Sequence, residues 1–456
     1  MKNDFPRLII AATQSGSGKT TITAGLLAAL KRRGQNVQSY KIGPDYIDTG
    51  WHSLASGKIS HNLDSWLVGE DKLKEIFTAT SEGADISIIE GVMGLYDGGR
   101  GGISSTAEIS KLLNAPVVLV IDAKSMGTSA AAIALGFREF DRTINLAGVI
   151  LNRVGSDSHR KMIVDELDKI GIKCFGAIRR NDEFILPERH LGLVPTTENN
   201  SADVIEKICA AVESQVDVDA LISLAKNSSP LKNLPYILNL KPYTLKIGVA
   251  KDEAFSFYYG ESLRELERLG AEIVFFSPLR DEHLPENISG LIIGGGFPEM
   301  FAARLEQNKK IRADIFHAAE IGLPIFAECG GFMYLMRELI DFSGKSFDMC
   351  GVLDGAAVMT DKLQMVGYVA AEILSDCVIG KAGDKIRAHE FHFSKELDVA
   401  GDRIFKCERM RTGKEYFAGA VKKNIVASYL HIHFAGCPNA AKTFIDACKK
   451  FRGLSS

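Results

Sequence analysis

The sequence predicts an α/β protein built from two domains, and three observations support this fold class. The chain has 456 residues, which is too long for one ordinary core because a domain usually holds about 150 residues. Short apolar runs rich in β-forming residues alternate with helical patterns in the first half, and the alternation begins again near residue 245. Such alternation implies βαβ units and parallel sheets covered on both faces.

The first domain is predicted over residues 1–213. Between its first two strands lies a helical pattern from Thr20 to Arg33, in which Ile22, Leu26 and Leu30 recur at helical spacing. The expected strands are RLIIAAT (7–13), NVQSYKI (36–42), ISIIEG (86–91), APVVLVIDA (115–123), NLAGVILNRV (145–154) and KCFGAI (173–178).

A linker is predicted over residues 214–244 and a second domain over residues 245–456. The linker stretch contains the polar sequence NSSP and three prolines, and neither a strand nor a helical pattern is sustained through it. The second domain starts with LKIGVAKD (245–252) and continues with AEIVFFSPL (271–279), GLIIGGGFPE (290–299) and LPIFAECGGF (323–332).

Composition favours small molecules as partners. The chain is 46% hydrophobic and 24% charged, with a formal net charge of -3, so it lacks the basic surplus that binds nucleic acid or anionic membranes. The first residues, MKNDFPRLIIAATQ, form neither a signal peptide nor a membrane span, which leads us to expect a cytoplasmic protein. Eight cysteines without a C-x-x-C pair are expected to be mostly reduced core residues.

The stretch AATQSGSGKTT (11–21) predicts a nucleotide site. A glycine-rich turn between a strand and a helix directs backbone N–H groups at phosphate oxygens, and this stretch has a predicted strand before it and a helix after it. Lys19 should reach the β and γ phosphates of ATP, and Thr20 should bind Mg²⁺. The residues predicted to bind ATP are Gly16, Ser17, Gly18, Lys19, Thr20 and Thr21.

One position departs from the usual phosphate loop, because Thr13 stands where a glycine is expected. Threonine is tolerable there if the backbone keeps a negative φ, since only a positive φ demands glycine. A chance glycine turn is the alternative interpretation of the whole stretch.

Four carboxylates are predicted to converge on this loop. Asp45 and Asp48 come from KIGPDYIDTGWH (41–52), and Glu90 and Asp97 come from IIEGVMGLYDGG (88–99). Both stretches follow predicted strands, and ligands of open α/β sheets gather at the carboxyl ends of strands. Mg²⁺ prefers such oxygen ligands, and we assign Asp45 and Glu90 to the metal.

Other roles stay open around this loop. Asp48 and Asp97 are assigned to substrate or metal, and a helix cap or turn role is the alternative for each carboxylate, above all for Asp97 beside two glycines. Asn152 ends another predicted strand and is assigned to ATP through its base, with a turn role as the alternative.

The second domain carries a candidate nucleophile. Cys329 in LPIFAECGGFMYL follows an apolar strand and precedes two glycines and a helical pattern, an arrangement that lowers a thiol pKa and supplies oxyanion donors. The alternative is a small buried thiol. A histidine must take its proton, and IVASYLHIHFAG (425–436) offers His431 and His433, which share a face if the strand runs on.

The remaining motifs of the second domain are glycine-rich or histidine-rich. Gly294, Gly295 and Gly296 follow a strand and are a source of oxyanion donors. The run RAHEFHFS (387–394) fits a polar strand or substrate rim better than a metal site, because no helical H-x-x-x-H or Cys/His cluster accompanies it.

Taken together, the motifs resemble the cobyrinic acid a,c-diamide synthase family, the glutamine-dependent amidases of cobalamin biosynthesis. The resemblance spans nearly the whole chain and includes QSGSGKTT, KIGPDYIDTGWH, LDSWL, IIEGVMGLYDGG, AECGGFMYL, RAHEFHFS and SYLHIHF in this order. It implies an N-terminal P-loop parallel-sheet domain similar to dethiobiotin synthetase, fused to a C-terminal class I glutamine amidotransferase domain.

The resemblance also implies a mechanism. A cysteine thiolate releases ammonia from L-glutamine through a glutamyl thioester, and ATP with Mg²⁺ phosphorylates a corrinoid carboxylate that ammonia then converts to an amide. The cycle runs twice, on the c and then the a acetate side chain. The resemblance assigns Cys329 as nucleophile and His431 as base, with His433 as second choice. It assigns Gly295, Gly296 and Gly330 as oxyanion donors.

Two departures from related proteins are visible. Class I amidotransferases commonly end their triad in His-Pro-Glu, whereas this chain has His431-Ile432-His433 and thus no acid at that place. The amidases of this group are similar in working with a Cys-His pair and in lacking the glycine at Thr13.

Three alternatives stay open at this point. Hydrogenobyrinate or nickel sirohydrochlorin could be amidated by the same chemistry in place of cobyrinate. A more distant alternative is an ATP-driven switch similar to partitioning ATPases, which would leave Cys329 without a role. No motif fixes the oligomeric state, and a homodimer stays open.

Overall fold

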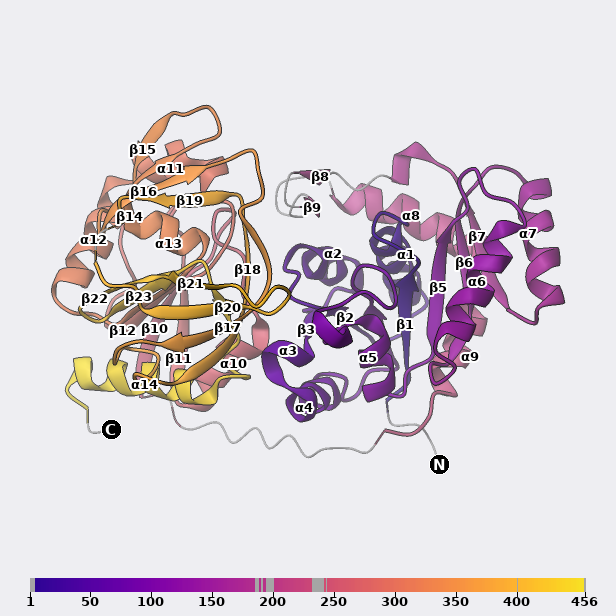
Figure 1. Cartoon of the computed structure of the whole chain (residues 1–456), viewed down its shortest axis with the longest axis horizontal. Helices are drawn as coiled ribbons and strands as arrows, with labels where there is room; N and C mark the ends of the chain where they lie inside the picture. Colours follow the sequence, from indigo (N-terminus) through magenta and orange to yellow (C-terminus); the bar gives the residue numbers. More distant parts are fainter. Residues whose placement is uncertain are drawn as a thin grey trace. The chain divides into compact units, whose positions relative to one another are not determined.

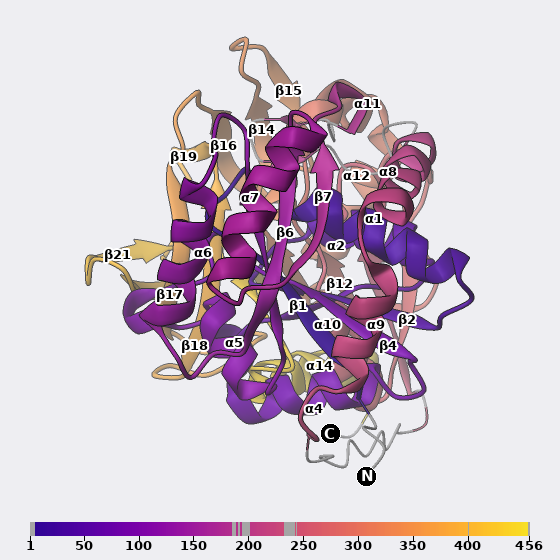
Figure 2. The same cartoon turned by 90° about the vertical axis from the view of Figure 1, so that its right-hand side faces the viewer.

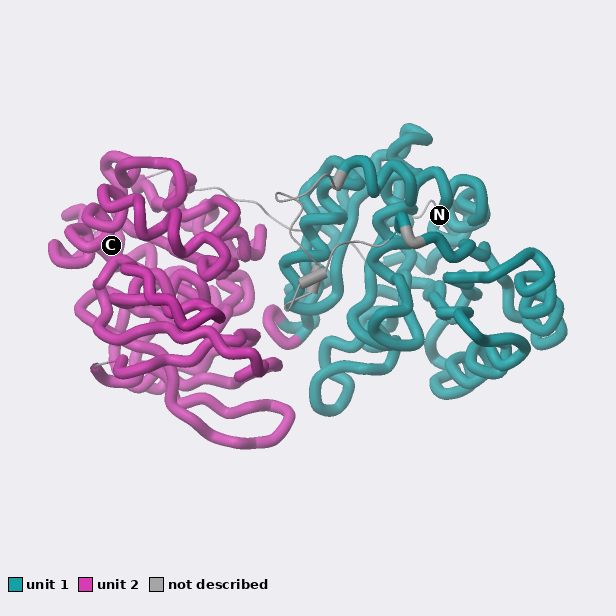
Figure 3. The backbone as a smooth tube through the Cα atoms, turned by 90° about the horizontal axis from the view of Figure 1, so that it is seen from above, with its two compact units in different colours: residues 1–65, 69–236 teal, residues 66–68, 237–456 magenta. Residues whose placement is uncertain are grey.

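The computed structural model describes residues 5–184, 188–189, 192–193, 201–231, 242, 244–399 and 401–454. Backbone contacts divide the chain into two compact units (Figure 3). The first contains residues 1–65 and 69–236, and the second contains residues 66–68 and 237–456. Within the described parts of both units, no helix combines the length and apolar character that crossing a membrane requires.

The stretch predicted as a linker is partly helical. Val218–Lys226 form helix α9, whose buried side chains pack against strand β1 (Arg7–Ala12) of the first unit. Residues 232–241 and 243 of the same stretch lie outside the described residues.

The first unit is built on a seven-stranded parallel sheet in the order β3-β2-β4-β1-β5-β6-β7 (Figure 1). The six strands predicted from the sequence are all present, and His61–Leu63 add the short edge strand β3. The other predicted strands are β2 (Val37–Ile42), β4 (Ile86–Glu90), β5 (Val117–Asp122), β6 (Leu146–Val154) and β7 (Cys174–Arg179), and β4 and β5 pair with β1. Every residue of β1 is buried, as a central parallel strand requires.

Helices cover both faces of this sheet. Helices α1, α8 and α9 lie on one face and α6 and α7 on the other (Figure 2). Gly25 brings α1 and α8 close, because a Cβ there would lie 2.6 Å from a methyl carbon of Ile208. The helices are α1 (Lys19–Arg32), α2 (Ile47–Ser56), α3 (Ser65–Val68), α4 (Glu70–Thr80), α5 (Thr106–Leu112), α6 (Ser129–Phe140), α7 (Asp157–Lys169) and α8 (Ser201–Gln215).

The position of β1 explains where a ligand can bind. The chain leaves β1 toward β2 on one side, and the later strands β5, β6 and β7 lie on its other side. This change of direction opens a crevice at the carboxyl end of β1, where ligands of doubly wound sheets bind. The predicted phosphate loop is the connection that leaves this strand end.

The second unit is centred on a six-stranded sheet in the order β11-β10-β12-β13-β23-β22, parallel except for its last pair. Its strands are β10 (Leu245–Ala250), β11 (Ala271–Phe276), β12 (Ile288–Ile293), β13 (Ile325–Glu328), β22 (Ala420–Lys422) and β23 (Ile425–Ser428). Its helices are α10 (Gly260–Arg268), α11 (Ala302–Gln307), α12 (Lys309–Glu320), α13 (Gly330–Leu335) and α14 (Pro438–Arg452).

Two further sheets, mostly antiparallel, were not predicted from the alternating pattern. One has the order β15-β14-β16-β19, and the other has the order β21-β20-β17-β18-β24. Their strands are β14 (Met336–Ile340), β15 (Ser346–Asp348), β16 (Leu353–Met359), β17 (Met365–Ile373), β18 (Lys385–His392), β19 (Ser394–Leu397), β20 (Phe405–Arg409), β21 (Glu415–Ala418) and β24 (His431–Ile432).

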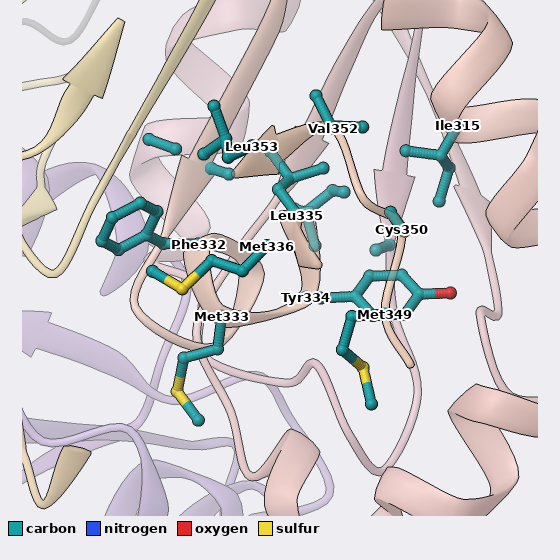
Figure 4. Packing of buried hydrophobic residues seen from close by; sticks show 14 of the residues in the cluster. Ile315, Phe332, Met333, Tyr334, Leu335, Met336, Met349, Cys350, Val352 and Leu353 are labelled. Carbon is teal, nitrogen blue, oxygen red and sulfur yellow. The ribbon is translucent and has the colours of Figure 1, made fainter. Parts of the chain in front are cut away.

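Helix α13 is short and wholly buried. Figure 4 shows Tyr334 of this helix beside Met349 and Cys350, and Phe332 and Met333 belong to the same buried cluster. A helix of six residues has little stability of its own, so this packing must hold it in place. The core therefore fixes the residue that precedes the helix, Cys329.

A buried arginine at the start of β1 holds several segments of the first unit together. Arg7 at the start of β1 is fully buried, and burial lowers the pKa of its guanidinium to about 10. The guanidinium donates hydrogen bonds to the carbonyl oxygens of Phe5, Leu113, Asn114 and Ser229 and to the hydroxyl of Ser228. It thus ties the segment after α9 to the central strand.

Replacing Arg7 should destabilise the first unit. Arg7→Met should lower the free energy of unfolding by about 2 to 4 kcal/mol, because several buried carbonyl oxygens lose their donors. Urea unfolding measures this change. The matched control is Arg32→Met, which removes an exposed arginine paired with Glu206 and should leave the unfolding midpoint unchanged. Equal effects of the two substitutions would contradict the anchoring role.

Candidate functional site

The phosphate loop has the backbone conformation that its glycines predict. Gly16 and Gly18 have φ values of 78° and 88°, which favour glycine. Thr13 does not have a positive φ, and its N–H continues the sheet by donating to the carbonyl of Val120. The Thr13 hydroxyl lies 3.4 Å from that of Ser17. Threonine is therefore compatible with this loop.

Side chains from the end of β6 support the loop. The amide nitrogen of Asn152 donates to the carbonyl of Ser17 at 2.9 Å. Arg153 donates to the carbonyl of Gly16 at 3.0 Å and pairs with Asp122 at 2.6 Å. Asn152 lines the same cavity as the loop, but its amide donor is engaged by the loop backbone. The role of Arg153 was missed from sequence.

Lys19 is the first residue of α1, and its side chain reaches the loop after β4. Its ammonium donates to the carbonyl of Met93, in the loop after β4, at 2.7 Å. Burial, and after it the nearby charge of Lys41, lowers the pKa of Lys19 to about 8. A phosphate group would offer this ammonium a stronger, charged acceptor than the carbonyl does.

Glu90 is the centre of a buried polar cluster. Its Oε1 accepts from the hydroxyl of Thr20 at 2.7 Å and from the ammonium of Lys41 at 2.7 Å. Its Oε2 lies 2.6 Å from Nε2 of His52. Burial raises the pKa of this carboxyl, but Lys41 and His52 outweigh burial and hold it well below its ordinary value. Glu90 is therefore an ionised carboxylate.

Lys41 and His52 were missed from sequence. Both lie within the quoted stretch KIGPDYIDTGWH, but the motif alone drew attention to its carboxylates. His52 lies one helical turn after Asp48 on α2, which brings it to the side of the helix that faces Glu90.

The other predicted carboxylates have different surroundings. Asp48 pairs with Lys41 at 2.5 Å, whereas Asp45 accepts the backbone N–H groups of Ile47 and Asp48 at the start of α2. Lys41, Asp45 and Asp48 line the same cavity as Glu90. Asp97 accepts the N–H of Gly94 at 3.1 Å, the turn role given above as its alternative, and is not among the lining residues.

This cavity has a volume of about 700 Å³ and contains groups suited to a nucleotide. The phosphate loop contributes the predicted residues Gly16, Gly18, Lys19, Thr20 and Thr21. The same wall includes the apolar side chains of Ile178, Phe184 and Ile208 and the cationic side chains of Lys124, Arg153, Arg179 and Arg180. An apolar surface suits a nucleobase, and the cations suit phosphates.

The carboxylates fit Mg²⁺ only with help from other ligands. Among the described residues, no group of three or more His, Cys, Asp and Glu side chains is arranged to hold a metal. Two carboxylates and the Thr20 hydroxyl leave several positions of an octahedral ion for phosphate and water, which is how Mg²⁺ binds in nucleotide sites.

Cys329 lies at a strained turn between β13 and α13. Its φ of 47° and ψ of -103° are unusual for a residue with a side chain, and its N–H donates to the carbonyl of Ser428 at 2.7 Å. A strained strand-to-helix turn is the geometry of nucleophile elbows. Burial raises the pKa of the thiol, Glu299 raises it further and the N–H of Gly330 opposes both, so the resting group is a neutral thiol.

The predicted oxyanion donors lie beside this elbow. The N–H of Gly331 donates to the carbonyl of Gly294 at 3.0 Å, which holds the glycine loop against the start of α13. A Cβ at Gly330 would lie 3.1 Å from the backbone nitrogen of Gly296, and a Cβ at Gly296 would lie 2.0 Å from the carbonyl oxygen of Ala254. Only glycine fits at position 296.

The two candidate histidines face different neighbours. Strand β24 ends at Ile432, so His433 does not continue the strand and instead stacks on Tyr259, with ring centroids 4.6 Å apart. His431 lies against the glycine loop, since a Cβ at Gly295 would lie 2.6 Å from its Cε1. Burial, followed by the charges of His389 and His392, lowers the pKa of His431 to about 3.

Glu328, the residue before Cys329, holds strand β24, which contains His431. Oε1 of Glu328 accepts the N–H of Ile432 at 2.6 Å, and burial raises the pKa of Glu328 to about 8. This contact was missed from sequence, because it joins residues that are far apart in the chain. The polar run of β18 supplies His389, which pairs in register with His431.

Comparison with known proteins places both units in described families. Residues 8–194 match the CobQ/CobB/MinD/ParA nucleotide binding domain, and residues 246–438 match the CobB/CobQ-like glutamine amidotransferase domain. These matches agree with the predicted fold class, a P-loop parallel-sheet domain followed by a glutamine amidotransferase domain.

Curated relatives match over nearly the whole chain. A cobyrinate a,c-diamide synthase of Dehalococcoides mccartyi is 43% identical, covering 99% of this chain and 100% of its own length. A cobyrinate a,c-diamide synthase of Caldanaerobacter subterraneus is 43% identical, covering 97% of this chain and 98% of its own. A hydrogenobyrinate a,c-diamide synthase of Streptomyces coelicolor is 40% identical with the same coverage, 97% and 98%. This chain belongs to the cobyrinate a,c-diamide synthase family of glutamine amidotransferases.

Proposed function

We propose that this protein catalyses the ATP- and glutamine-dependent amidation of the a and c acetate carboxylates of cobyrinate. The proposal rests on two sites in one chain. In the first, Thr20 of the phosphate loop donates a hydrogen bond to the ionised Glu90, and in the second, Cys329 forms a strained elbow beside a glycine loop. The first suits phosphoryl transfer, and the second suits the release of ammonia from glutamine.

The chemistry in the second unit starts with Cys329. The sulfur attacks the side-chain amide carbon of glutamine while His431 takes the thiol proton, and the N–H groups of Gly296 and Gly330 donate hydrogen bonds to the developing oxyanion. Since burial holds both Cys329 and His431 neutral, proton transfer accompanies the attack. His431 then gives its proton to the leaving ammonia, and water hydrolyses the glutamyl thioester.

The chemistry in the first unit activates a carboxylate. A substrate carboxylate oxygen attacks the γ phosphorus of ATP, which gives an acyl phosphate and ADP. Ammonia attacks the acyl carbon, and phosphate leaves with one oxygen of the original carboxylate. Lys19 and the cationic wall stabilise charge on the phosphates, and Mg²⁺ held by Thr20 and Glu90, with Asp45 and Asp48 nearby, would neutralise more of it.

The choice of macrocycle rests on the relatives, since the two names among them differ in the central metal. We propose cobyrinate because the relatives from Dehalococcoides and Caldanaerobacter bear that name. Purified protein should be incubated with ATP, Mg²⁺, glutamine and either cobyrinate, hydrogenobyrinate or nickel sirohydrochlorin. Mass spectrometry should show two amidations of cobyrinate at the highest rate, and faster turnover of another macrocycle would overturn this choice. ATP and glutamine are cytoplasmic metabolites, so we propose the same location for the enzyme.

Cys329→Ala should separate the two nitrogen sources. Amidation with glutamine should fall by about a thousandfold or more, because the thiol nucleophile is lost. Amidation with a high ammonium concentration should persist, because carboxylate activation does not need the thiol. Cys377→Ala, a half-buried cysteine of the same unit, serves as the matched control and should keep both activities. Loss of both activities in Cys329→Ala, with the fold intact, would contradict the two-site mechanism.

Lys19→Ala should have the opposite pattern. Amidation should fall by about a hundredfold or more with either glutamine or ammonium, since the variant lacks a cation at the transferring phosphoryl group. Glutamate release from glutamine should continue. Parallel assays of glutamate and corrinoid amide measure the two activities, and an unchanged amidation rate would remove Lys19 from the reaction.

The pH profile of glutamate release should lack an acid limb near pH 6.5. A histidine base must be neutral, and a pKa of about 3 keeps His431 neutral as the pH falls through the range in which an ordinary histidine gains a proton. kcat/KM for glutamine should therefore show no midpoint between pH 5.5 and about 7. Circular dichroism at each pH checks that the chain stays folded, and a midpoint near 6.5 would show that His431 titrates normally.

A further inference from the structure

Lys41 lies where the proposed metal site would be. It lies near the end of β2 with its side chain buried, and its Nζ lies 2.5 Å from Oδ2 of Asp48 and 2.7 Å from Oε1 of Glu90. It also donates to the carbonyl of Gly91 at 3.2 Å. The two carboxylates assigned to metal or substrate are thus already joined by a cation of the protein itself.

The contacts of Thr20 show that this cation and the metal would use the same atoms. The Thr20 hydroxyl lies 2.7 Å from Oε1 of Glu90 and 3.4 Å from Oδ2 of Asp48. A carboxylate oxygen has about two lone-pair positions, and Lys41 with Thr20 fills both positions of Oε1. A divalent ion between Thr20 and Glu90 would therefore compete with Lys41 for that oxygen.

Charge gives the reason for a lysine at this place. Glu90 is fully buried and Asp48 is nearly so, and two buried carboxylates that share a small space repel each other strongly unless a cation lies between them. Lys41 supplies one positive charge to these two carboxylates. A magnesium ion would supply two positive charges at the same oxygens. If Lys41 stayed in place, the ammonium and the metal ion would repel each other.

We propose that Lys41 substitutes for the divalent cation in the empty ATP site and must leave Asp48 and Glu90 when Mg²⁺ arrives with the nucleotide. This inference rests on the proposed function, because it assumes that the cavity binds magnesium nucleotide. It follows that the protein alone has little affinity for a divalent ion. The phosphates, which bring their own oxygen ligands and attract the displaced ammonium, make the exchange favourable.

Manganese provides the probe, because Mn²⁺ takes the same oxygen ligands as Mg²⁺ and its free form is counted by electron paramagnetic resonance. Wild-type protein without nucleotide should bind almost no Mn²⁺ at micromolar concentrations, and protein with ADP should remove more free Mn²⁺ than the same concentration of ADP alone. Lys41→Met removes the charge while keeping an unbranched side chain of similar length. It should bind Mn²⁺ without nucleotide about tenfold or more tightly than wild type, since Asp48 and Glu90 lose the ammonium that lies between them.

Three further variants make the test specific. Lys41→Arg keeps the charge and should show no gain, and Lys124→Met, which removes another lysine that lines the cavity, should also show none. Lys41→Met combined with Glu90→Gln should lose the gain, because Glu90 is the proposed metal ligand. If Lys41→Met does not fold, tight Mn²⁺ binding by wild-type protein without nucleotide would still overturn the proposal.

Two results would overturn the inference. One is tight Mn²⁺ binding by wild-type protein without nucleotide, and the other is an unchanged Mn²⁺ affinity in Lys41→Met. Either result leaves the proposed function standing if wild-type protein still forms corrinoid amide from ATP and glutamine. Absence of that turnover in wild-type protein, whatever the Mn²⁺ data, would overturn the proposed function itself.

Discussion

The buried carboxylate of Glu90 is the constraint on which the ATP site depends. An ionised carboxylate with no exposed surface is stable only with partners, and Thr20, Lys41 and His52 provide them from three different elements. These contacts join the phosphate loop, the end of β2 and helix α2 at the carboxyl edge of the sheet. The same negative charge that requires cations in the protein also suits a metal nucleotide, so one residue serves both stability and function.

In the second unit, burial keeps the two residues proposed for catalysis, Cys329 and His431, neutral rather than charged. Cys329 and His431 are buried, and burial raises the pKa of the thiol and lowers that of the imidazole. Glu328 does not occupy the place of the missing triad acid but holds the backbone of Ile432. In the proposed mechanism, Cys329 and His431 are positioned by backbone contacts and by the packing of α13.

Much of this could be predicted from sequence because it is local. The phosphate loop, the elbow at Cys329 and the six strands of the first sheet are marked by short patterns of glycine and apolar residues. What was missed depends on pairing across the fold: Lys41 and His52 meet Glu90 only after β2, α2 and β4 assemble. The antiparallel sheets of the second unit were missed because the prediction rested on strands that alternate with helices, whereas these strands follow one another directly. Asp97, which was assigned to substrate or metal, accepts the N–H of Gly94 within a turn.

The central claim is that the first unit converts a carboxylate into an acyl phosphate. The most direct test uses cobyrinate labelled with ¹⁸O in its carboxylates, with ATP, Mg²⁺ and unlabelled glutamine, followed by mass analysis of the inorganic phosphate. The mechanism predicts one ¹⁸O atom in phosphate for each amide formed, since phosphate leaves with a carboxylate oxygen. Amide formation with unlabelled phosphate would contradict it.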